Sequence, residues 1–180
     1  MKKSVYFVLS VCVVSTTQAQ SCSTTNTVRT APDYRYELVV GSGGSEVLDK
    51  ATGLIWQRCS LGQSWNGTTC TGTASTHTWT DALAKAKALG NGYRLPNIKE
   101  LLSLIERAAC IRPTINRTFF PTSVDSRYTR YWSGSSYAET ETMSEAHFYR
   151  RAWSVLFDDG SSSPGFKHHD FLVRAVRVSQ

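Results

Sequence analysis

Residues 92–102 read Gly-Tyr-Arg-Leu-Pro-Asn-Ile-Lys-Glu-Leu-Leu, and this stretch contains the clearest helix start in the sequence. Asn97 is a favoured N-cap residue, and Glu100 follows it at the spacing of a capping box. The apolar residues that follow share one helical face: Ile98, Leu101, Leu102, Ile105 and Ala109. The stretch therefore predicts a helix that begins after Pro96 and runs towards Cys110.

A second helix is predicted immediately upstream, over residues 79–90. Thr80 is its expected N-cap, and Asp81 places a negative charge in the first turn, where it suits the exposed backbone N–H groups. Gly90 is a typical terminator of a helix. The apolar positions again lie on one face: Ala82, Leu83, Ala86 and Leu89.

Strand-like segments precede the two helices. Residues 36–40 have the composition of a strand, and residues 46–49 and 54–57 flank the Gly-bearing turn at 50–53 as a hairpin. Residues 63–78 are rich in Gly, Thr and Ser and show no periodicity of a helix or strand, so they are expected to form a loop.

Further strands are predicted after the helices, at residues 131–136, 146–149 and 153–157. Residues 158–160 (Asp-Asp-Gly) signal a turn, and the loop is expected to continue through 161–165. Residues 171–178 are interpreted as the closing strand, in which Arg174 and Arg177 oppose the apolar side chains. This order of elements predicts an α+β domain with a mostly antiparallel sheet and two helices.

The first residues have the pattern of a secretory signal peptide. Met1-Lys2-Lys3 is cationic, residues 5–14 are apolar but too short to cross a bilayer of about 30 Å, and residues 17–19 offer small side chains for cleavage. No later stretch suits a transmembrane segment, so we expect an exported protein that is periplasmic, cell-surface or secreted. Three parts are expected: a signal peptide at 1–19, an N-terminal arm and first strand at 20–45, and one domain at 46–180.

The cysteines fit an exported chain. Cys12 leaves with the signal peptide, and the four cysteines that remain indicate two disulfides. Three pairings are possible, and Cys59–Cys70 is favoured because it closes a short loop rich in Gly, Thr and Ser. That choice leaves Cys22–Cys110. A zinc site is disfavoured because no C-x-x-C pair is present.

The charge is moderate. The chain has 20 basic and 14 acidic residues, and loss of Lys2 and Lys3 with the signal leaves 18 basic residues and a net charge of +4. The basic residues are scattered, which argues weakly for an anionic partner and does not call for nucleic acid.

Short motifs follow one another along the chain. They are Asp49-x-x-Thr52-Gly53-Leu54-Ile55-Trp56, Trp79-x-x-Ala82, Gly92-Tyr93-Arg94-Leu95-Pro96-Asn97, Tyr131-Trp132-Ser133, Val155-x-Phe157-x-x-Gly160 and Val173-Arg174-Ala175-Val176-Arg177. In this order they resemble the C-terminal domain family of the Legionella collagen-like adhesin (Lcl), over about residues 46–178. The resemblance implies a fold related to C-type lectin-like and sulfatase-modifying-factor proteins.

The same resemblance implies a function. The best-known member of the family is an adhesin whose domain binds sulfated glycosaminoglycans and assembles as a trimer. We therefore expect a binding module for an anionic polysaccharide or a host or surface glycan, and the resemblance implies a homo-oligomer. This chain lacks the collagen-like repeat of that adhesin. The alternative is a non-catalytic structural or interaction subunit of an extracellular or pilus-like assembly.

Catalysis is not expected. The sulfatase-modifying enzymes work with a reactive cysteine pair late in the chain, whereas no cysteine follows Cys110 here. A Gly-x-Ser-x-Gly nucleophile elbow is also missing. Residues 168–170 (His-His-Asp) do not predict a metal site, because adjacent residues of a strand point to opposite faces. We expect no cofactor.

Basic and aromatic residues gather in the second half of the chain, outside the motifs of the family. Arg binds sulfate or carboxylate through its planar fork, and binding residues concentrate on loops held by a rigid scaffold. The predicted ligand contacts are Arg127, Tyr128, Arg130, Tyr149, Arg150, Arg151, Lys167 and His168, with Phe166 and His169 beside them. The competing interpretation is a mixed, solvated surface.

Several conspicuous residues are instead expected to be structural. We expect Arg94 to pair with a carboxylate and order the loop before the helix. Trp56, Trp79 and Trp132 are expected to pack in the core. Trp65, inside the loop closed by Cys59 and Cys70, stays open between packing and stacking on a sugar.

Overall fold

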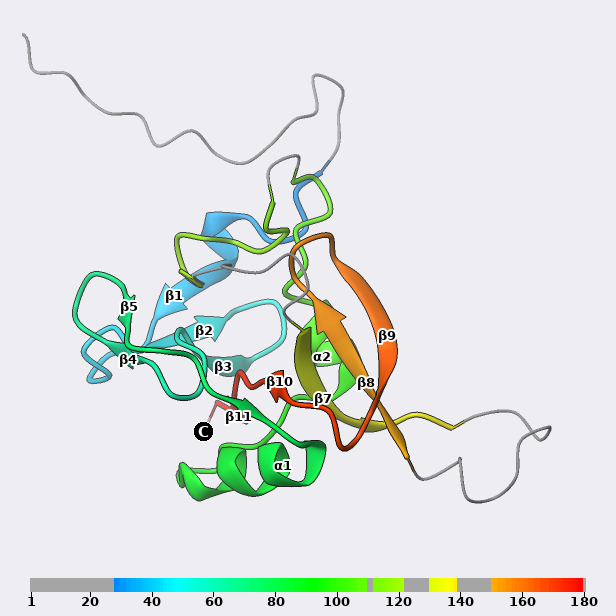
Figure 1. Ribbon diagram of the computed structural model, residues 1–180. Coiled ribbons are helices and arrows are strands. Elements are labelled where there is room, and N and C mark those ends of the chain that lie inside the picture. The colour runs from blue at the N-terminus through cyan, green and yellow to red at the C-terminus, as the bar shows by residue number, and fades with distance from the viewer. Residues whose placement is uncertain (1–27, 110–111, 122–129, 139–149, 180) are drawn as a thin grey trace, which may run out of the picture.

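The computed structural model describes residues 28–109, 112–121, 130–138 and 150–179, which form two β-sheets with two α-helices beside them (Figure 1). The first sheet is antiparallel and contains, in order, β1 (Tyr36–Leu38), β2 (Glu46–Asp49), β3 (Leu54–Gln57) and β11 (Val176–Val178). The second contains β6 (Thr76–His77), β10 (Phe171–Leu172), β7 (Arg130–Ser136), β8 (Arg151–Leu156) and β9 (Ser161–Phe166).

In the second sheet β10 and β7 are parallel, and the other pairs are antiparallel. The remaining elements are the 3-10 helix η1 (Asp33–Arg35), the small hairpin of β4 (Ser64–Trp65) and β5 (Cys70–Thr71), and the helices α1 (Trp79–Ala88) and α2 (Ile98–Leu102). The expected α+β class, with mostly antiparallel sheets and two helices, is confirmed.

The start of α2 is held as the sequence predicts. The Asn97 side chain accepts a hydrogen bond from the Glu100 backbone N–H at 2.9 Å, and the Glu100 carboxylate accepts one from the Asn97 backbone N–H at 2.7 Å. Arg94 donates to both carboxylate oxygens of Glu100, each at 2.7 Å. The expected structural role of Arg94 is therefore confirmed: it fixes the loop before the helix.

The predicted end of this helix is wrong, because α2 stops at Leu102. The chain turns after the helix so that Ile105 can form a β-bridge with Ile115. Glu106 then points into the protein, with 1 % of its surface exposed. An amphipathic pattern that continues past Leu102 could not reveal these contacts with distant segments.

Glu106 fastens the N-terminal segment to the domain. Its carboxylate accepts the backbone N–H groups of Thr30, Ala31 and Ala108, each at 3.0 Å, and the Arg29 Nε at 3.3 Å. Burial by itself raises the pKa of Glu106, but these backbone donors and the charge of Arg29 outweigh it, so the pKa lies below its ordinary value.

The residues just before the predicted domain are part of its core. Ala31 and Tyr36 have 0 % and 4 % of their surface exposed and belong to the same buried cluster as Val47, Trp56 and Phe120. A second cluster lies under α1 and includes Trp132 with the helix residues Ala82 and Ala86, together with Tyr93, Leu95, Ala152, Val173 and Ala175. Trp56 and Trp132 are fully buried, as expected.

Two predictions around α1 need correction. Thr78, and not Thr80, caps the helix: its hydroxyl accepts the Asp81 backbone N–H at 3.3 Å and donates to the Asp81 carboxylate at 2.8 Å. Residues 63–78 are also more than a loop, since they contain β4, β5 and β6. β4 and β5 pair with each other, whereas β6 pairs with the distant β10, which the local composition does not indicate.

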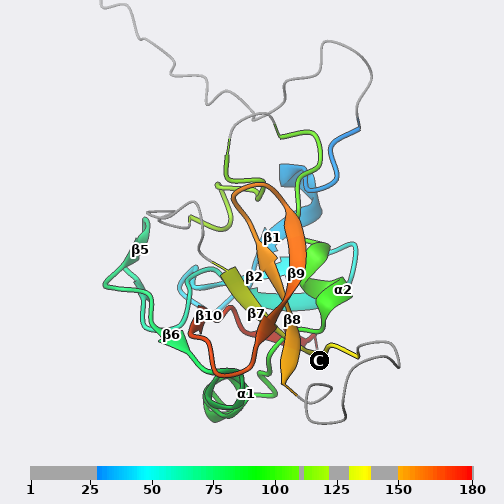
Figure 2. The same cartoon turned by 45° about the vertical axis from the view of Figure 1, so that its right-hand side comes forward.

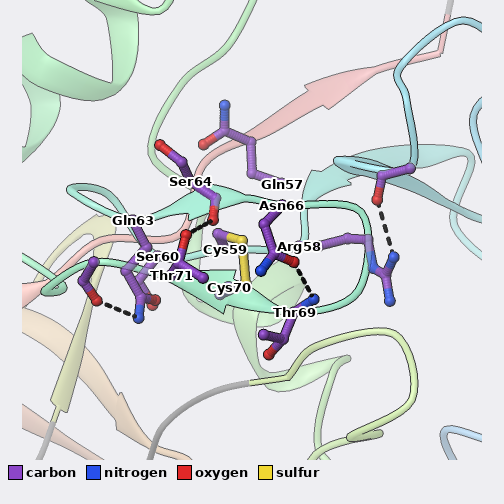
Figure 3. The surroundings of a disulfide bond; sticks show 12 residues. Gln57, Arg58, Cys59, Ser60, Gln63, Ser64, Asn66, Thr69, Cys70 and Thr71 are labelled. Carbon is purple, nitrogen blue, oxygen red and sulfur yellow. Dashed lines mark hydrogen bonds between the residues drawn. A yellow bond between two sulfur atoms is a disulfide. The ribbon is translucent and has the colours of Figure 1, made fainter.

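The disulfide Cys59–Cys70 is confirmed, and it closes the loop that carries β4 and β5 (Figure 3). Trp65 pairs with Cys70 across the hairpin, and the Asn66 side chain accepts the Thr69 backbone N–H at 2.8 Å in the turn. The predicted partners Cys22 and Cys110 lie outside the described residues, as does the strand predicted at 146–149.

The C-terminal part differs from the prediction in two places. Residues 161–165, expected as a loop, belong to β9, which pairs with β8 along its whole length. Pro164 is tolerated there because β9 is an edge strand. Residues 171–178 are not one strand: β10 and β11 lie in different sheets, and the three residues between them include Arg174, which is fully buried.

We predict that Glu106→Gln lowers the free energy of unfolding by about 2 kcal/mol, because one amide cannot accept all the donors that the carboxylate accepts. A group whose pKa is lowered by folding stabilises the protein above its ordinary pKa, here 4.5, and the stabilisation is lost as the pH falls through the folded value. Urea unfolding between pH 7 and 3 measures both effects. Glu37→Gln, an exposed change on β1, is the control and should leave both unchanged.

We predict that Cys59→Ala/Cys70→Ala lowers the free energy of unfolding by about 3 kcal/mol, given a sequence separation of 11 residues between the two cysteines. Thr68→Ala, an exposed change in the same loop, should have little effect. Chemical denaturation of both variants gives the comparison. A loss below about 1 kcal/mol would mean that the β4–β5 contacts hold the loop without the crosslink.

Candidate ligand-binding site

The hairpin of β8 and β9 brings together several of the residues predicted to contact a ligand (Figure 2). Arg151 at the start of β8 is directly opposite Phe166 at the end of β9, so their side chains lie on the same face of the sheet. The guanidinium carbon of Arg151 is 4.4 Å from the centroid of the Phe166 ring, within the range of a cation–π contact.

The segment after β9 adds a second cation on a second ring. The Lys167 backbone N–H donates to the Arg150 carbonyl at 2.6 Å, which ties the segment to the start of β8. The Lys167 Nζ lies 4.1 Å from the centroid of the Trp79 ring and 3.1 Å from the Ser136 Oγ. Trp79 is held in turn by its indole N–H, which donates to the Ser133 carbonyl at 2.8 Å.

Two exposed imidazoles complete the group. The His168 ring stacks on Phe166 with centroids 5.5 Å apart, and the His169 ring meets His168 edge-on at 4.7 Å. We call Arg150, Arg151, Phe166, Lys167, His168 and His169 the hairpin-end cluster. It combines three permanent cations with flat rings, and Asp170 is the acidic residue that follows directly in the chain.

Close packing beneath the cluster requires a glycine. A Cβ at residue 165 would lie 2.5 Å from the Phe171 ring and 3.1 Å from the Trp132 ring. Because residue 165 is Gly, Phe171 can pack on Trp132, with ring centroids 4.3 Å apart, directly behind the strand that carries Phe166. The cluster therefore stands on a tightly packed aromatic layer.

The structure does not bring all the predicted residues together. Arg130 begins β7 opposite Leu156, at the far end of β8 from Arg151, and it donates a short hydrogen bond to the Ser163 hydroxyl. Five residues of a strand separate the two arginines, or about 17 Å. Arg127, Tyr128 and Tyr149 lie outside the described residues.

The sequence interpretation missed Trp79 as a neighbour of the cluster. Trp79 was expected in the core, but it is only half-buried, and one face of its ring contacts Lys167. Its position as the first residue of α1 was a usable signal, since the first turn of a helix is often half exposed. Trp65 is different, because the Arg58 guanidinium lies 3.8 Å from its ring centroid and covers one face.

Within the described residues, no three His, Cys, Asp or Glu side chains are arranged to hold a metal ion. None of the helices in the described part of the chain is long and apolar enough to cross a membrane.

Comparison with protein families gives a match to the Lcl C-terminal domain over residues 45–177, and this confirms the resemblance inferred from the motifs. The chain is also similar to the crystal structure of EMS16, an antagonist of the collagen receptor integrin α2β1 (GPIa/IIa). The TM-score is 0.38 and the sequence identity 13 %, with 67 % of this chain and 99 % of that chain covered. No property of EMS16 extends to this chain at that level of similarity. No curated protein matches the sequence.

Proposed function

The chain belongs to the Lcl C-terminal domain family, and we propose that it is an exported, non-catalytic binding module for anionic glycans, in particular sulfated polysaccharides. The observation that carries the proposal is the hairpin-end cluster. In it, Arg151 and Lys167 are each held against an aromatic ring, and His168 stacks beside them.

The chemistry of the cluster suits an acidic sugar chain. Arg and Lys bind sulfate or carboxylate oxygens, and the Phe166 ring holds the Arg151 guanidinium and the His168 imidazole beside each other. A cation that already rests on a ring loses less side-chain freedom when an anion binds, which favours affinity. Lys167 and the two imidazoles sit on the connection between β9 and β10, a loop held at both ends by the sheet, and Arg151 lies at the start of β8.

Export is supported by the oxidised pair of cysteines. Disulfides persist in oxidising compartments such as the periplasm, the cell surface and the extracellular space. Cys59–Cys70 is therefore in line with the signal peptide expected at residues 1–19. We propose that the module works in one of these three locations.

We predict that the purified, oxidised protein is retained on a heparin column above physiological salt, and that Arg151→Ala/Lys167→Ala elutes much earlier. Loss of the two cations should weaken binding by roughly tenfold or more, since a hydrogen bond to a charged group contributes about 1.5–3 kcal/mol. Steep weakening with rising salt is also expected, because exposed charges are screened within about 8 Å at 0.15 M.

Lys85→Ala/Lys87→Ala is the matched control, because it removes the same charge from the exposed face of α1. This control should elute close to the wild type. Equal losses in both variants would mean that the column senses net charge and not a site. If the wild type passes through at low salt, the glycan proposal is wrong, and a protein partner in an extracellular assembly becomes the leading function.

A further inference from the structure

A groove lies on the side of the molecule that carries the N-terminal segment, and none of its lining residues belongs to the hairpin-end cluster. It consists of two adjoining hollows of about 420 and 370 Å³ that share Thr30 and Arg35. Its walls are the segment around η1, the turn between β2 and β3, and the residues in and after α2. Figures 1 and 2 both place η1 at one end of the molecule and α1, which packs beside the hairpin-end cluster, at the other.

Arg35 builds the ridge between the two hollows. Its Nε and NH2 donate to the carboxylate of Asp49, and its NH1 donates to the carbonyls of Thr30 at 2.8 Å and Ser103 at 2.9 Å. The guanidinium thus joins β2, the N-terminal segment and the end of α2. With its donors occupied in this way, Arg35 shapes the groove and leaves ligand contacts to other residues.

The second wall is equally fixed. The Thr30 hydroxyl donates to the Ile105 carbonyl at 2.7 Å and accepts the Arg107 backbone N–H at 2.8 Å. Arg29 is paired with the buried Glu106 at 3.3 Å. These contacts hold the N-terminal segment against the residues that follow α2, so the groove exists before any ligand binds.

The lining of the groove is strongly basic. Its charged members are all cations: Arg29, Arg35, Lys50, Lys99 and Arg107. Acidic partners neutralise Arg29 and Arg35, whereas the exposed side chains of Lys50, Lys99 and Arg107 have no acidic partner among the described residues. The preceding residues 1–27 contain no Asp or Glu that could neutralise them.

Apolar and aromatic residues line the same two hollows. Tyr34, with 77 % of its surface exposed, lies with Pro32 and Ala51 in the first hollow. Leu102 and Ile105 line the second. The ligand that matches this pattern carries anionic groups at intervals along a flat, partly apolar backbone, as acidic sugar rings do.

An extended acidic peptide fits less well. In one common mode, an extended peptide adds to an exposed strand edge and gains main-chain hydrogen bonds. The lining residues belong to a 3-10 helix, a turn, an α-helix and irregular segments, and none of them lies in a strand. The groove offers spaced charges and rings in place of a strand edge.

We propose that this groove is a second anion-binding site, which takes a segment of an acidic polysaccharide through Lys50, Lys99 and Arg107. The two sites share no residue, so substitutions in one can be tested separately from substitutions in the other. A single chain with both sites can engage two glycan segments at once and so gain avidity without a multimeric stalk.

The test measures the stoichiometry and affinity of a heparin-derived hexasaccharide by titration calorimetry on the full exported chain. The wild type should bind two molecules per chain. Lys99→Ala/Arg107→Ala should bind one, with the groove affinity at least about tenfold weaker, while Lys85→Ala/Lys87→Ala keeps both sites. Lys99 and Arg107 are exposed, so a melting temperature equal to that of the wild type confirms that the variant is folded.

Each outcome decides between the two sites. If the groove variant binds like the wild type, the groove proposal is overturned, whatever the hairpin-end cluster does. If Arg151→Ala/Lys167→Ala alone removes all binding, the groove proposal also fails and the function proposed above stands. If the groove variant loses binding and the cluster variant does not, the groove is the glycan site and the cluster is not.

Two other polymers test which anionic group and which kind of polymer the groove binds. Polygalacturonate carries carboxylates only. If the groove binds it as tightly as the heparin fragment, the site accepts either carboxylate or sulfate. If the groove binds only the heparin fragment, the site requires sulfate. Poly-glutamate tests the peptide alternative. If it binds the groove more tightly than both polysaccharides, the polysaccharide proposal is overturned in favour of an acidic protein partner.

Discussion

The guanidinium of Arg174 lies between the two sheets and joins them. It is fully buried, and its NH1 donates to the carbonyls of Gln57, at 2.9 Å, and Arg58 at the end of β3. On either side of it, the carbonyls of Val173 and Ala175 accept the backbone N–H groups of Leu61, at 2.9 Å, and Gln57, at 3.1 Å. The chain passes from β10 in one sheet to β11 in the other at this residue, and these contacts tie the crossover to the end of β3 and the residues after it.

A buried cation needs compensation, since removing it from water is costly. Burial lowers the pKa of Arg174, and the faces of Phe120 and Tyr131, at 5.2 and 5.6 Å from the guanidinium carbon, supply the negative potential that favours its charged form. Tyr131 is itself held by a 2.7 Å hydrogen bond between its hydroxyl and that of Ser60. The junction is therefore a network of backbone carbonyls and aromatic rings around one charge, and both candidate binding sites are attached to the sheets that it joins.

Local signals in the sequence predicted the features that depend on neighbours along the chain. The capping box of Asn97 and Glu100, the hairpin of residues 46–57 and the Cys59–Cys70 bridge all involve residues close in sequence. The burial of Arg174 could not be predicted from such local signals, because an Arg in an alternating strand pattern normally faces the solvent. Its burial depends on Phe120 and Tyr131, which are distant in the sequence.

The two candidate binding sites also differ in how far the sequence predicts them. The hairpin-end cluster could be predicted in part, because Arg151 and Lys167 lie on either side of one hairpin and the composition around them is basic and aromatic. Arg130 was grouped with them for its nearness in sequence, and the register of β7 against β8 places it at the other end. The groove could not be predicted from any one stretch of the sequence. Lys50 lies far from Lys99 and Arg107 in the sequence, and the folded N-terminal segment brings the residues around them together. That segment is held by the Glu106 carboxylate together with Arg35 and the Thr30 hydroxyl, so contacts between residues far apart in the sequence form the basic groove.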